Sequence, residues 1–354
     1  MTCAANQPKH CRRRCQFGLK PAFVFIAVLC LPLAWAGTRM NQKRRERAVI
    51  AELERLGATV RYEWQGERLD GLWEFSSRRN AAPPGQAWLR RLLGSDFFSH
   101  VVYVSIPIRQ RIYVGRRTGL KYRLSGSDTD RSFNDEDLGL VATLRKLEIL
   151  DLSKSKIGDA GLRHLQGLTS LRSIDLSATN ITDAGLVHLR HLISMRRLYL
   201  DGTPLAGSTL GYLKQMADLE TLQLSYTSVT DSAIVQLKDM RRLRHLSLNG
   251  TRVSDSGIDN LRKLAALETL SVAGCAIGDS ALSNCECLQG LRKLNLGGTM
   301  VTDAALTNLR KLDGLLWLRL DNTKISAEGI VTIRRALPNC EIDLGPLAPW
   351  DAFP

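Results

Sequence analysis

The chain has 354 residues, of which 44 % are hydrophobic and 6 % aromatic, and a formal net charge of +14. Residues 1–50 carry ten Lys and Arg against one acidic residue, whereas the other 304 residues carry 39 basic and 34 acidic side chains. A charge excess that lies largely at one end is a weak argument for a nucleic-acid partner and a better one for contact with an anionic membrane surface. The eight cysteines show no even spacing, so we expect no disulfide framework.

Residues 22–37 carry no charge and would span about 24 Å as a helix, against a hydrocarbon core of about 30 Å. We predict a transmembrane anchor at 21–38, preceded by a basic segment at 1–20. The alternative is a secretory signal peptide cleaved after Ala36, within the small-residue stretch Ala34-Trp35-Ala36. Basic residues flank the run on both sides, which leaves the orientation open. We favour repeats outside the cytoplasm, because exported chains begin with a basic cluster and an apolar run.

Residues 39–122 are predicted to form a juxtamembrane helix and an N-terminal cap. A helix is expected at 40–56, because Val49, Ile50, Leu53 and Leu56 recur on one face. Its basic start at 43–47 suggests either a solvated helix end or a contact with lipid headgroups.

The rest of this region is expected to cover the first repeat, as the end of a solenoid requires. Its predicted elements are a strand through Val60, Tyr62 and Trp64, a loop at 80–85, a helix at 86–93 and a strand ending at Ile106. The aromatic residues of this region are interpreted as the core of the cap.

From Leu147 the chain repeats every 24 residues without insertion or deletion. The units begin at Leu147, Leu171, Met195, Leu219, Leu243, Leu267, Leu291 and Leu315. Residues 123–146 are interpreted as a degenerate repeat, and residues 107–132 as an insertion or an irregular first turn. The L-x-x-L-x-L phrase that opens each unit is the leucine-rich-repeat signature. We therefore predict an α/β solenoid over 123–345, with a curved parallel sheet inside and short helices outside, followed by a tail at 346–354.

Two further positions in the unit are nearly invariant. The ninth is Thr or Ser, except for Cys275, and its hydroxyl is expected to hydrogen-bond the turning backbone, with a weaker bond at Cys275. The thirteenth is Asp in most units, and we predict that it caps the helix that follows it. Repeats three and eight lack this Asp, and Ser is expected to substitute there. Both positions are interpreted as structural.

The phrase Asn180-Ile-Thr-Asp-Ala-Gly-Leu186 resembles the bacterial T-x-I-T-D-A-G-L class of leucine-rich repeat. Together with the apolar run and the segments at 47–57 and 88–98, it is similar to membrane-anchored leucine-rich-repeat proteins of planctomycete-type bacteria. That resemblance implies the fold and the anchoring but no ligand. The repeat phrase also occurs in F-box leucine-rich-repeat proteins. The chain shows no F-box-like helical module, which disfavours a ubiquitin-ligase adaptor.

Strand residues that point away from the core would line the concave face, the usual binding surface of such a solenoid. An acidic cluster is expected near the start of the array, polar and aromatic side chains in the middle, and a Trp and Arg pair near the end. Exposed aromatic residues and Arg are the types that anchor interfaces. The candidate protein-binding residues are Asp151, Asp175, Arg197, Tyr199, Asp201, Gln223, Tyr226, His245, Asn249, Asn295, Trp317 and Arg319.

No sequence motif for catalysis is found. The chain contains neither a phosphate-binding Gly-rich loop nor a G-x-S-x-G elbow. The close pair Cys285 and Cys287 has no second pair beside it, so a metal site is disfavoured. We expect neither cofactor nor metal.

The predicted function is therefore a non-enzymatic, membrane-anchored scaffold. It would bind another protein on its concave face and lipid through its N-terminal segment, with no nucleic-acid partner. The alternative is a secreted or periplasmic protein, cleaved after Ala36, that binds an envelope polysaccharide on Tyr199, Tyr226 and Trp317. An enzymatic or ligase-adaptor role is the least favoured hypothesis.

Overall fold

The computed structural model describes residues 19–62, 99–106, 133–283 and 288–345, together with short pieces between 65 and 97. For residues 19–33 it describes the backbone alone. The predicted insertion at 107–132, the tail at 346–354, the pair Cys285 and Cys287 and most of the helix at 86–93 lie outside the described residues, as do Trp64 and the loop at 80–85 apart from Pro83.

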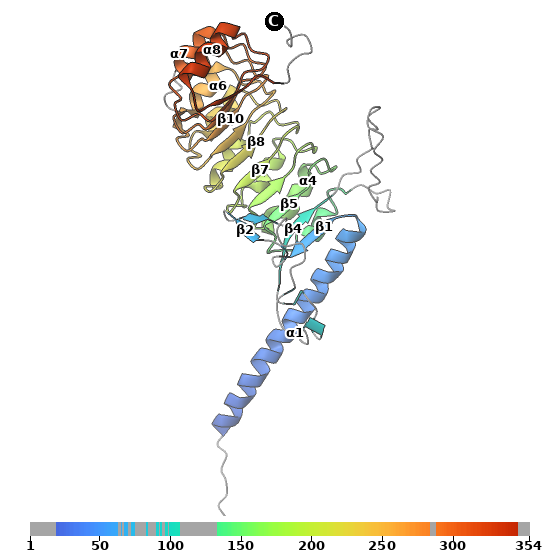
Figure 1. Ribbon diagram of the computed structural model, residues 1–354. Coiled ribbons are helices and arrows are strands. Elements are labelled where there is room, and N and C mark those ends of the chain that lie inside the picture. Colours follow the sequence, from blue (N-terminus) through green and yellow to red (C-terminus); the bar gives the residue numbers. More distant parts are fainter. Residues whose placement is uncertain are drawn as a thin grey trace, which may run out of the picture.

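An eleven-stranded sheet runs through the molecule in the order β1-β4-β5-β6-β7-β8-β9-β10-β11-β12-β13. All neighbours from β4 to β13 are parallel, whereas β1 is antiparallel to β4. Figure 1 shows the strands stacked one on the next from β4 towards the C-terminal end. The strands are β1 (Thr59–Tyr62), β4 (Val101–Ser105), β5 (Ile149–Asp151), β6 (Ser173–Asp175), β7 (Arg197–Tyr199), β8 (Thr221–Gln223), β9 (His245–Ser247), β10 (Thr269–Ser271), β11 (Lys293–Asn295), β12 (Trp317–Arg319) and β13 (Glu341–Asp343). A separate hairpin pairs β2 (Glu67–Leu69) with β3 (Leu72–Glu74).

Short helical turns form the second layer. They are α3 (Leu138–Val141), α4 (Asp159–Leu162), η2 (Arg163–Gly167), η3 (Gly185–Leu189), η4 (Leu210–Gln215), α5 (Asp231–Ile234), η5 (Val235–Leu237), α6 (Asp255–Asn260), η6 (Leu261–Lys263), η7 (Asp279–Leu282), η9 (Asp303–Ala305), α7 (Leu306–Leu309) and α8 (Ala327–Ala336). Leucines of both layers meet in one continuous core. Leu150, Leu162 and Leu198 are fully buried in it. The predicted solenoid is confirmed.

The hydroxyl at the ninth position forms the predicted bonds. Thr179, Thr203 and Thr227 each donate to the carbonyl three residues earlier, at 2.6 Å. The thiol of Cys275 does not follow the pattern, because it donates to the Leu248 carbonyl of the previous repeat at 3.0 Å. Leu248 already accepts the hydroxyl of Thr251.

The prediction that the thirteenth-position Asp caps its own helix is wrong. Its carboxylate reaches the next repeat instead. The two oxygens of Asp159 accept the backbone N–H of Thr182 at 2.8 Å and its hydroxyl at 2.6 Å, and Asp231 does the same with Ser254. Where a turn has a side-chain cap, the residue before the Asp supplies it, as Thr302 does for the Ala304 N–H at 3.2 Å. These carboxylates therefore act as staples between successive repeats.

In repeat three, Ser does not substitute for the missing Asp as predicted. The thirteenth residue of this repeat, Gly207, has φ +87°, and a Cβ built there would lie 2.4 Å from the Cβ of Ala233. Gln236 makes the link to repeat four, donating to the Gly207 carbonyl at 2.9 Å and accepting from the Gly211 N–H at 2.6 Å. In repeat eight, Ser326 caps α8 by accepting from the Gly329 N–H at 3.0 Å.

The array has strands at both ends that the repeat phase alone does not indicate. β4 takes the place expected for a strand within 123–146, because Val104 pairs with Leu150 although 46 residues separate them. The degenerate repeat therefore draws its strand from 101–105 and its helix from α3. At the other end, β13 adds a ninth strand to the eight predicted ones, with Ile342 in register with Leu318.

The helix α1 (Leu19–Arg55) is a single element of 37 residues, whereas an apolar segment and a separate helix at 40–56 were expected. It runs through Gly37, and its first half projects from the base of the solenoid in Figure 1. Ile50 and Leu53 are buried in the core as predicted. No helix within the described residues is both apolar and long enough to cross a membrane. The predicted anchor at 21–38 falls mostly on residues whose side chains are outside the description.

The basic start of the 40–56 segment partly faces protein, which corrects the two predicted alternatives. Lys43 is 1 % exposed, and its ammonium donates to Glu46 and to the Ser99 carbonyl, both at 2.6 Å. The guanidinium of Arg47 pairs with Asp96 at 2.6 Å. Arg44 and Arg45 are exposed. Two of these cations therefore hold α1 against the cap.

Candidate functional site

The concave face is built by the first and third residues of each strand. Between them the middle residue is buried, from Leu150 at 0 % to Leu294 at 2 % exposed. Because side chains alternate along a strand, the flanking residues point to the opposite face. The parallel register then sets Asp151 beside Asp175, and Asp175 beside Tyr199. Each step to the next strand is about 4.8 Å.

Three carboxylates gather at the start of this face. We call Asp151, Asp175 and Asp201 the acidic cluster. All three are partly exposed, and none makes an ion pair within 4.0 Å among the described residues. Their polar contacts are to serines: Asp175 accepts the Ser177 N–H at 2.9 Å and Asp201 the Ser225 N–H at 2.7 Å. Like charges on adjacent strands repel, so a cation from outside would relieve the cluster.

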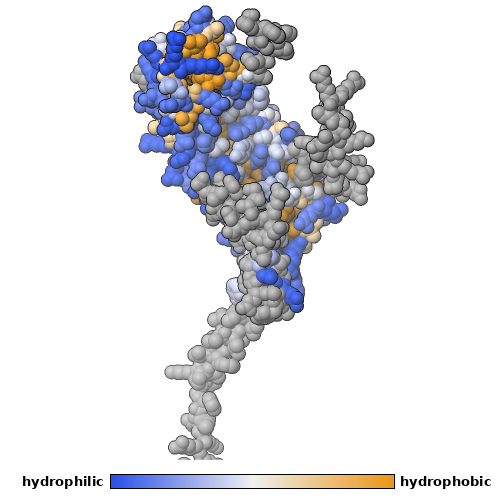
Figure 2. Space-filling view, in the orientation of Figure 1, coloured by the Kyte–Doolittle hydropathy of each residue, from blue (hydrophilic) through white to orange (hydrophobic). Residues whose placement is uncertain are grey.

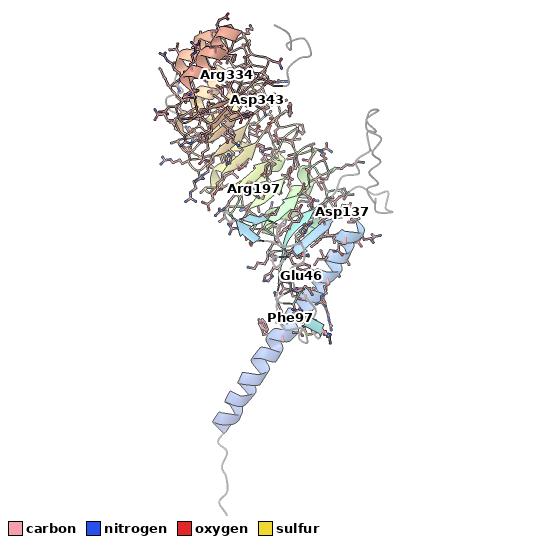
Figure 3. All side chains as sticks on the ribbon, viewed as in Figure 1. Glu46, Phe97, Asp137, Arg197, Arg334 and Asp343 are labelled. Carbon is pink, nitrogen blue, oxygen red and sulfur yellow. The ribbon has the colours of Figure 1, made fainter. Side chains whose placement is uncertain are left out.

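Burial changes the titration of two groups here. Desolvation, with a smaller contribution from the charge on Asp175, raises the pKa of Asp201, although hydrogen bonds from Ser225 oppose that shift. Desolvation also raises the pKa of Tyr199, against the nearby positive charge of Arg197. Figure 3 labels Arg197 on its strand, part-way along the sheet. Tyr199 and Arg197 thus form a half-buried edge beside the carboxylates.

The middle of the face is largely occupied by its own hydrogen bonds. The Asn249 carbonyl oxygen accepts from the Ser271 hydroxyl at 2.6 Å and from the Ala273 N–H at 2.9 Å. Asn295 accepts the Gly297 N–H at 3.0 Å, and a ring nitrogen of His245 lies 3.0 Å from the Thr269 hydroxyl. Gln223 follows Tyr199 in register and is partly exposed. Asn249 and Asn295 therefore have backbone-supporting roles that compete with ligand binding.

The two predicted residues at the end of the array, Trp317 and Arg319, differ in their contacts. Arg319 pairs with Asp321 at 2.6 Å, which raises the pKa of Arg319 and lowers the pKa of Asp321. Trp317 is partly exposed. Five strand steps separate β7 from β12, or about 24 Å. The acidic cluster and this pair are therefore two places on the face rather than one site.

Sequence reasoning missed the left-handed backbone conformation at the eighth position of each unit, just after the strand. This position has positive φ in every unit, from Asn322 at 53° to Gly274 and Gly298 at 68°. Tyr226 holds this conformation at 57° with its side chain 74 % exposed, although bulky residues disfavour it. The signal was present, because glycine recurs at 24-residue intervals through 250, 274 and 298.

A charge ladder on the second position was missed too. Glu148 pairs with Arg172 at 3.0 Å, and the same position gives Arg196 with Glu220 at 3.5 Å and Arg244 with Glu268 at 3.4 Å. The available signal was that the second position is Glu or Arg in seven successive units, with opposite charges in most neighbouring ones. Pairs that are this exposed contribute little stability, about 0–1 kcal/mol each.

Comparison with known proteins agrees with the repeat architecture. Residues 145–205 match the sequence model of the family described as leucine rich repeat. This part of the chain is a leucine-rich-repeat array. The comparison with curated proteins finds no match.

Solved leucine-rich-repeat structures resemble the chain at low identity. Internalin C2 of Listeria monocytogenes is 24 % identical, with 60 % of this chain and 84 % of that one covered and a TM-score of 0.47. A leucine-rich-repeat protein of Leptospira interrogans is 23 % identical, with 58 % and 56 % covered and a TM-score of 0.45. Internalin F of Listeria monocytogenes is 23 % identical, with 58 % of this chain and 69 % of that one covered and a TM-score of 0.42. Likenesses at this level carry no argument about function.

No group of three or more His, Cys, Asp and Glu side chains within the described residues could hold a metal ion. The face presents carboxylates that form no ion pair with another described residue, a half-buried tyrosine and an exposed one.

Proposed function

We propose that this protein is a non-enzymatic scaffold, held at a membrane by its N-terminal segment, that binds a basic segment of another protein through the acidic cluster. The observation that carries the proposal is that Asp151, Asp175 and Asp201 lie together on the concave face without an ion pair in the described structure. Lys or Arg of a partner would supply the missing positive charge. Tyr199 and Arg197 would add a rim for contacts to the partner backbone.

The membrane part of the proposal rests on the uncharged run at 22–37 and the helix that continues it into the solenoid. We also propose the division into a basic segment, an anchor, a cap, repeats and a tail. The basic cluster before the apolar run supports repeats outside the cytoplasm. Resistance of the protein to extraction by alkaline carbonate would test the anchor, and an N-terminus at Gly37 in the mature protein would refute it.

A binding experiment tests the recognition surface. We expect an octalysine peptide to bind the full chain, and an octaglutamate peptide not to bind. The variant Asp151→Asn/Asp175→Asn/Asp201→Asn should lose about tenfold in affinity, because three exposed charge pairs at about 0.5 kcal/mol each sum to about 1.5 kcal/mol. The matched control is Asp239→Asn/Asp313→Asn/Glu328→Gln, which removes three exposed acids from outside the concave strands. An equal loss in both variants, or in neither, would reject the acidic cluster as the site.

A second candidate function is binding of an envelope polysaccharide. Tyr226 favours it, because an exposed aromatic ring in a strained backbone conformation is a suitable stacking platform for sugars. A Cβ built on Gly250 would lie 2.9 Å from that ring, so the ring lies against bare backbone with its outer face free of the next repeat. Tyr226→Ala that left binding of an acidic envelope polysaccharide unchanged would reject this function.

A further inference from the structure

Three hollows adjoin at the base of the solenoid, beside α1. The first, of about 410 Å³, lies between Trp35, Arg39, Phe97 and His100. The second, of about 320 Å³, shares Arg39 and His100 and extends to Lys146. The third, of about 240 Å³, shares His100 and Lys146. Neighbouring hollows share lining residues and therefore lie side by side, and we call the three together the basal trough; Arg39, Arg145 and Lys146 all line the second one. Figure 3 labels Phe97 and Glu46, which line its first and second parts.

The basal trough is positively charged. Arg39, Arg145 and Lys146 line it, and in the described part of the chain none of them lies within 4.0 Å of a carboxylate. The closest polar contact of the Arg39 guanidinium is the Gln42 carbonyl oxygen at 3.4 Å. The two acids of the trough are already neutralised: Glu46 by Lys43 at 2.6 Å and Glu148 by Arg172 at 3.0 Å. Three cations therefore face the trough without a counter-charge from any residue that the structure describes.

An aromatic side chain stands at the entrance. Trp35 is 59 % exposed, and its ring meets Phe97 edge to face at a centroid distance of 6.3 Å. It is near the end of the uncharged run at 22–37, and Arg39 follows one helical turn later, about 6 Å along the axis. Trp is enriched where the hydrocarbon of a membrane meets the headgroups, because it has an apolar body and one N–H donor. If that run enters a bilayer, the trough opens at headgroup depth.

We propose that the basal trough binds the headgroup of an anionic phospholipid. Arg39, Arg145 and Lys146 contact the phosphate and any further negative charge, and Trp35 lies beside the glycerol region. The inference rests on the membrane placement proposed above, but it is independent of the acidic cluster. It differs from a general attraction to an anionic surface, because it needs three cations around one hollow rather than any three exposed cations.

The test uses the full chain in a neutral detergent, titrated with phosphatidylglycerol or phosphatidylcholine and followed by native mass spectrometry of bound lipid. The variant is Arg39→Gln/Arg145→Gln/Lys146→Gln. Its control, Arg44→Gln/Arg45→Gln/Lys156→Gln, removes the same charge from exposed residues outside the trough. We expect saturable binding of phosphatidylglycerol that weakens about tenfold or more in the variant and less than about threefold in the control.

Three outcomes would overturn the proposal: equal binding of phosphatidylcholine, equal weakening in variant and control, or unchanged binding in the variant. A third arm adds glycerol 3-phosphate. If this soluble phosphate competes as well as the lipid does, the trough binds free phosphates and the lipid assignment is wrong. Carbonate extraction of the parent protein is measured separately, so that a failed anchor is distinguished from a failed trough.

Discussion

The hydroxyl at the ninth position of each repeat gives a stability prediction that can be worked from the hydrogen bonds. In Thr227→Val the side chain keeps its shape but loses its donor. Within the described part of the chain the Leu224 carbonyl accepts that hydroxyl at 2.6 Å and no backbone N–H. Leu224 is fully buried, so the variant leaves an acceptor unsatisfied, which costs about 1–3 kcal/mol. The added methyl returns about 0.8 kcal/mol. We expect a net loss of about 1 kcal/mol.

Thr251→Val is the matched control. Thr251 is as buried as Thr227, at 7 % against 6 % exposed. Its acceptor, the Leu248 carbonyl, would keep two donors, the Thr251 N–H at 3.2 Å and the Cys275 thiol at 3.0 Å. The lost hydroxyl is therefore nearly offset by the methyl, and we expect a change below about 0.5 kcal/mol.

Urea unfolding of both full-length variants, followed by far-UV circular dichroism, measures the difference. At a slope of about 2–3 kcal/mol/M, Thr227→Val should lower the midpoint by about 0.3–0.5 M, and Thr251→Val by much less, with unchanged slopes. Equal midpoints for the two variants would refute the reasoning, because the hydroxyl would then contribute the same whether or not its acceptor has another donor.

Four further predictions follow from other contacts. Lys43→Met should lower the free energy of unfolding by about 3 kcal/mol, because it leaves Glu46 without its buried cation. The control Arg44→Met, at an exposed residue, should change it by less than about 0.5 kcal/mol. Thermal unfolding of the two variants measures the difference. Folding raises the pKa of Asp201, so its charge opposes folding at neutral pH and this cost disappears below its ordinary pKa; Asp201→Asn should be more stable than the parent at pH 7 and equal to it at pH 3 in urea titrations. The charge of Asp303 favours folding instead, because hydrogen bonds from Ser326 lower the pKa of Asp303. Asp303→Asn should therefore be less stable than the parent at pH 7, and this difference in the free energy of unfolding should shrink as the pH falls below 3.8. Cys275→Thr should add a hydroxyl bond to the Val272 carbonyl and stabilise the array by about 0.5–1 kcal/mol, which a lower urea midpoint than that of the parent would contradict.

The repeat architecture could be predicted because one local pattern decides it. The Leu positions set the core, the 24-residue spacing sets the parallel register, and the Thr hydroxyls bond as expected. What the pattern could not show is which neighbour a side chain reaches. Asp159 could equally cap its own turn or bond Thr182 of the next repeat, and only the stacking distance decides between them.

The candidate site was less accessible to such reasoning. Which strand positions face outward follows from alternation, so the acidic cluster was found. Whether an outward side chain is free depends on its neighbours: Arg319 is taken by Asp321, and Asn249 by Ser271 and Ala273. The basal trough escaped notice because Arg39 comes from α1, Phe97 and His100 from the segment before β4, and Arg145 and Lys146 from the degenerate repeat, and these residues have no common spacing in the chain.

Because the same contact joins most repeats to the next, the number of repeats in the array can change without a change in how neighbouring repeats are held together. Each staple joins equivalent positions 23 residues apart, as in Asp231 to Ser254 and Asp255 to Gly278. Excision of residues 232–255 would remove Ser254 and Asp255 and put Asp231 in the place of Asp255, where its carboxylate would accept the Gly278 N–H. The shortened protein should fold, with Tyr226 and Trp317 closer by one strand spacing, about 4.8 Å. Recombination between units could thus adjust the separation of two contact points on the face in fixed increments, without a change in either of them.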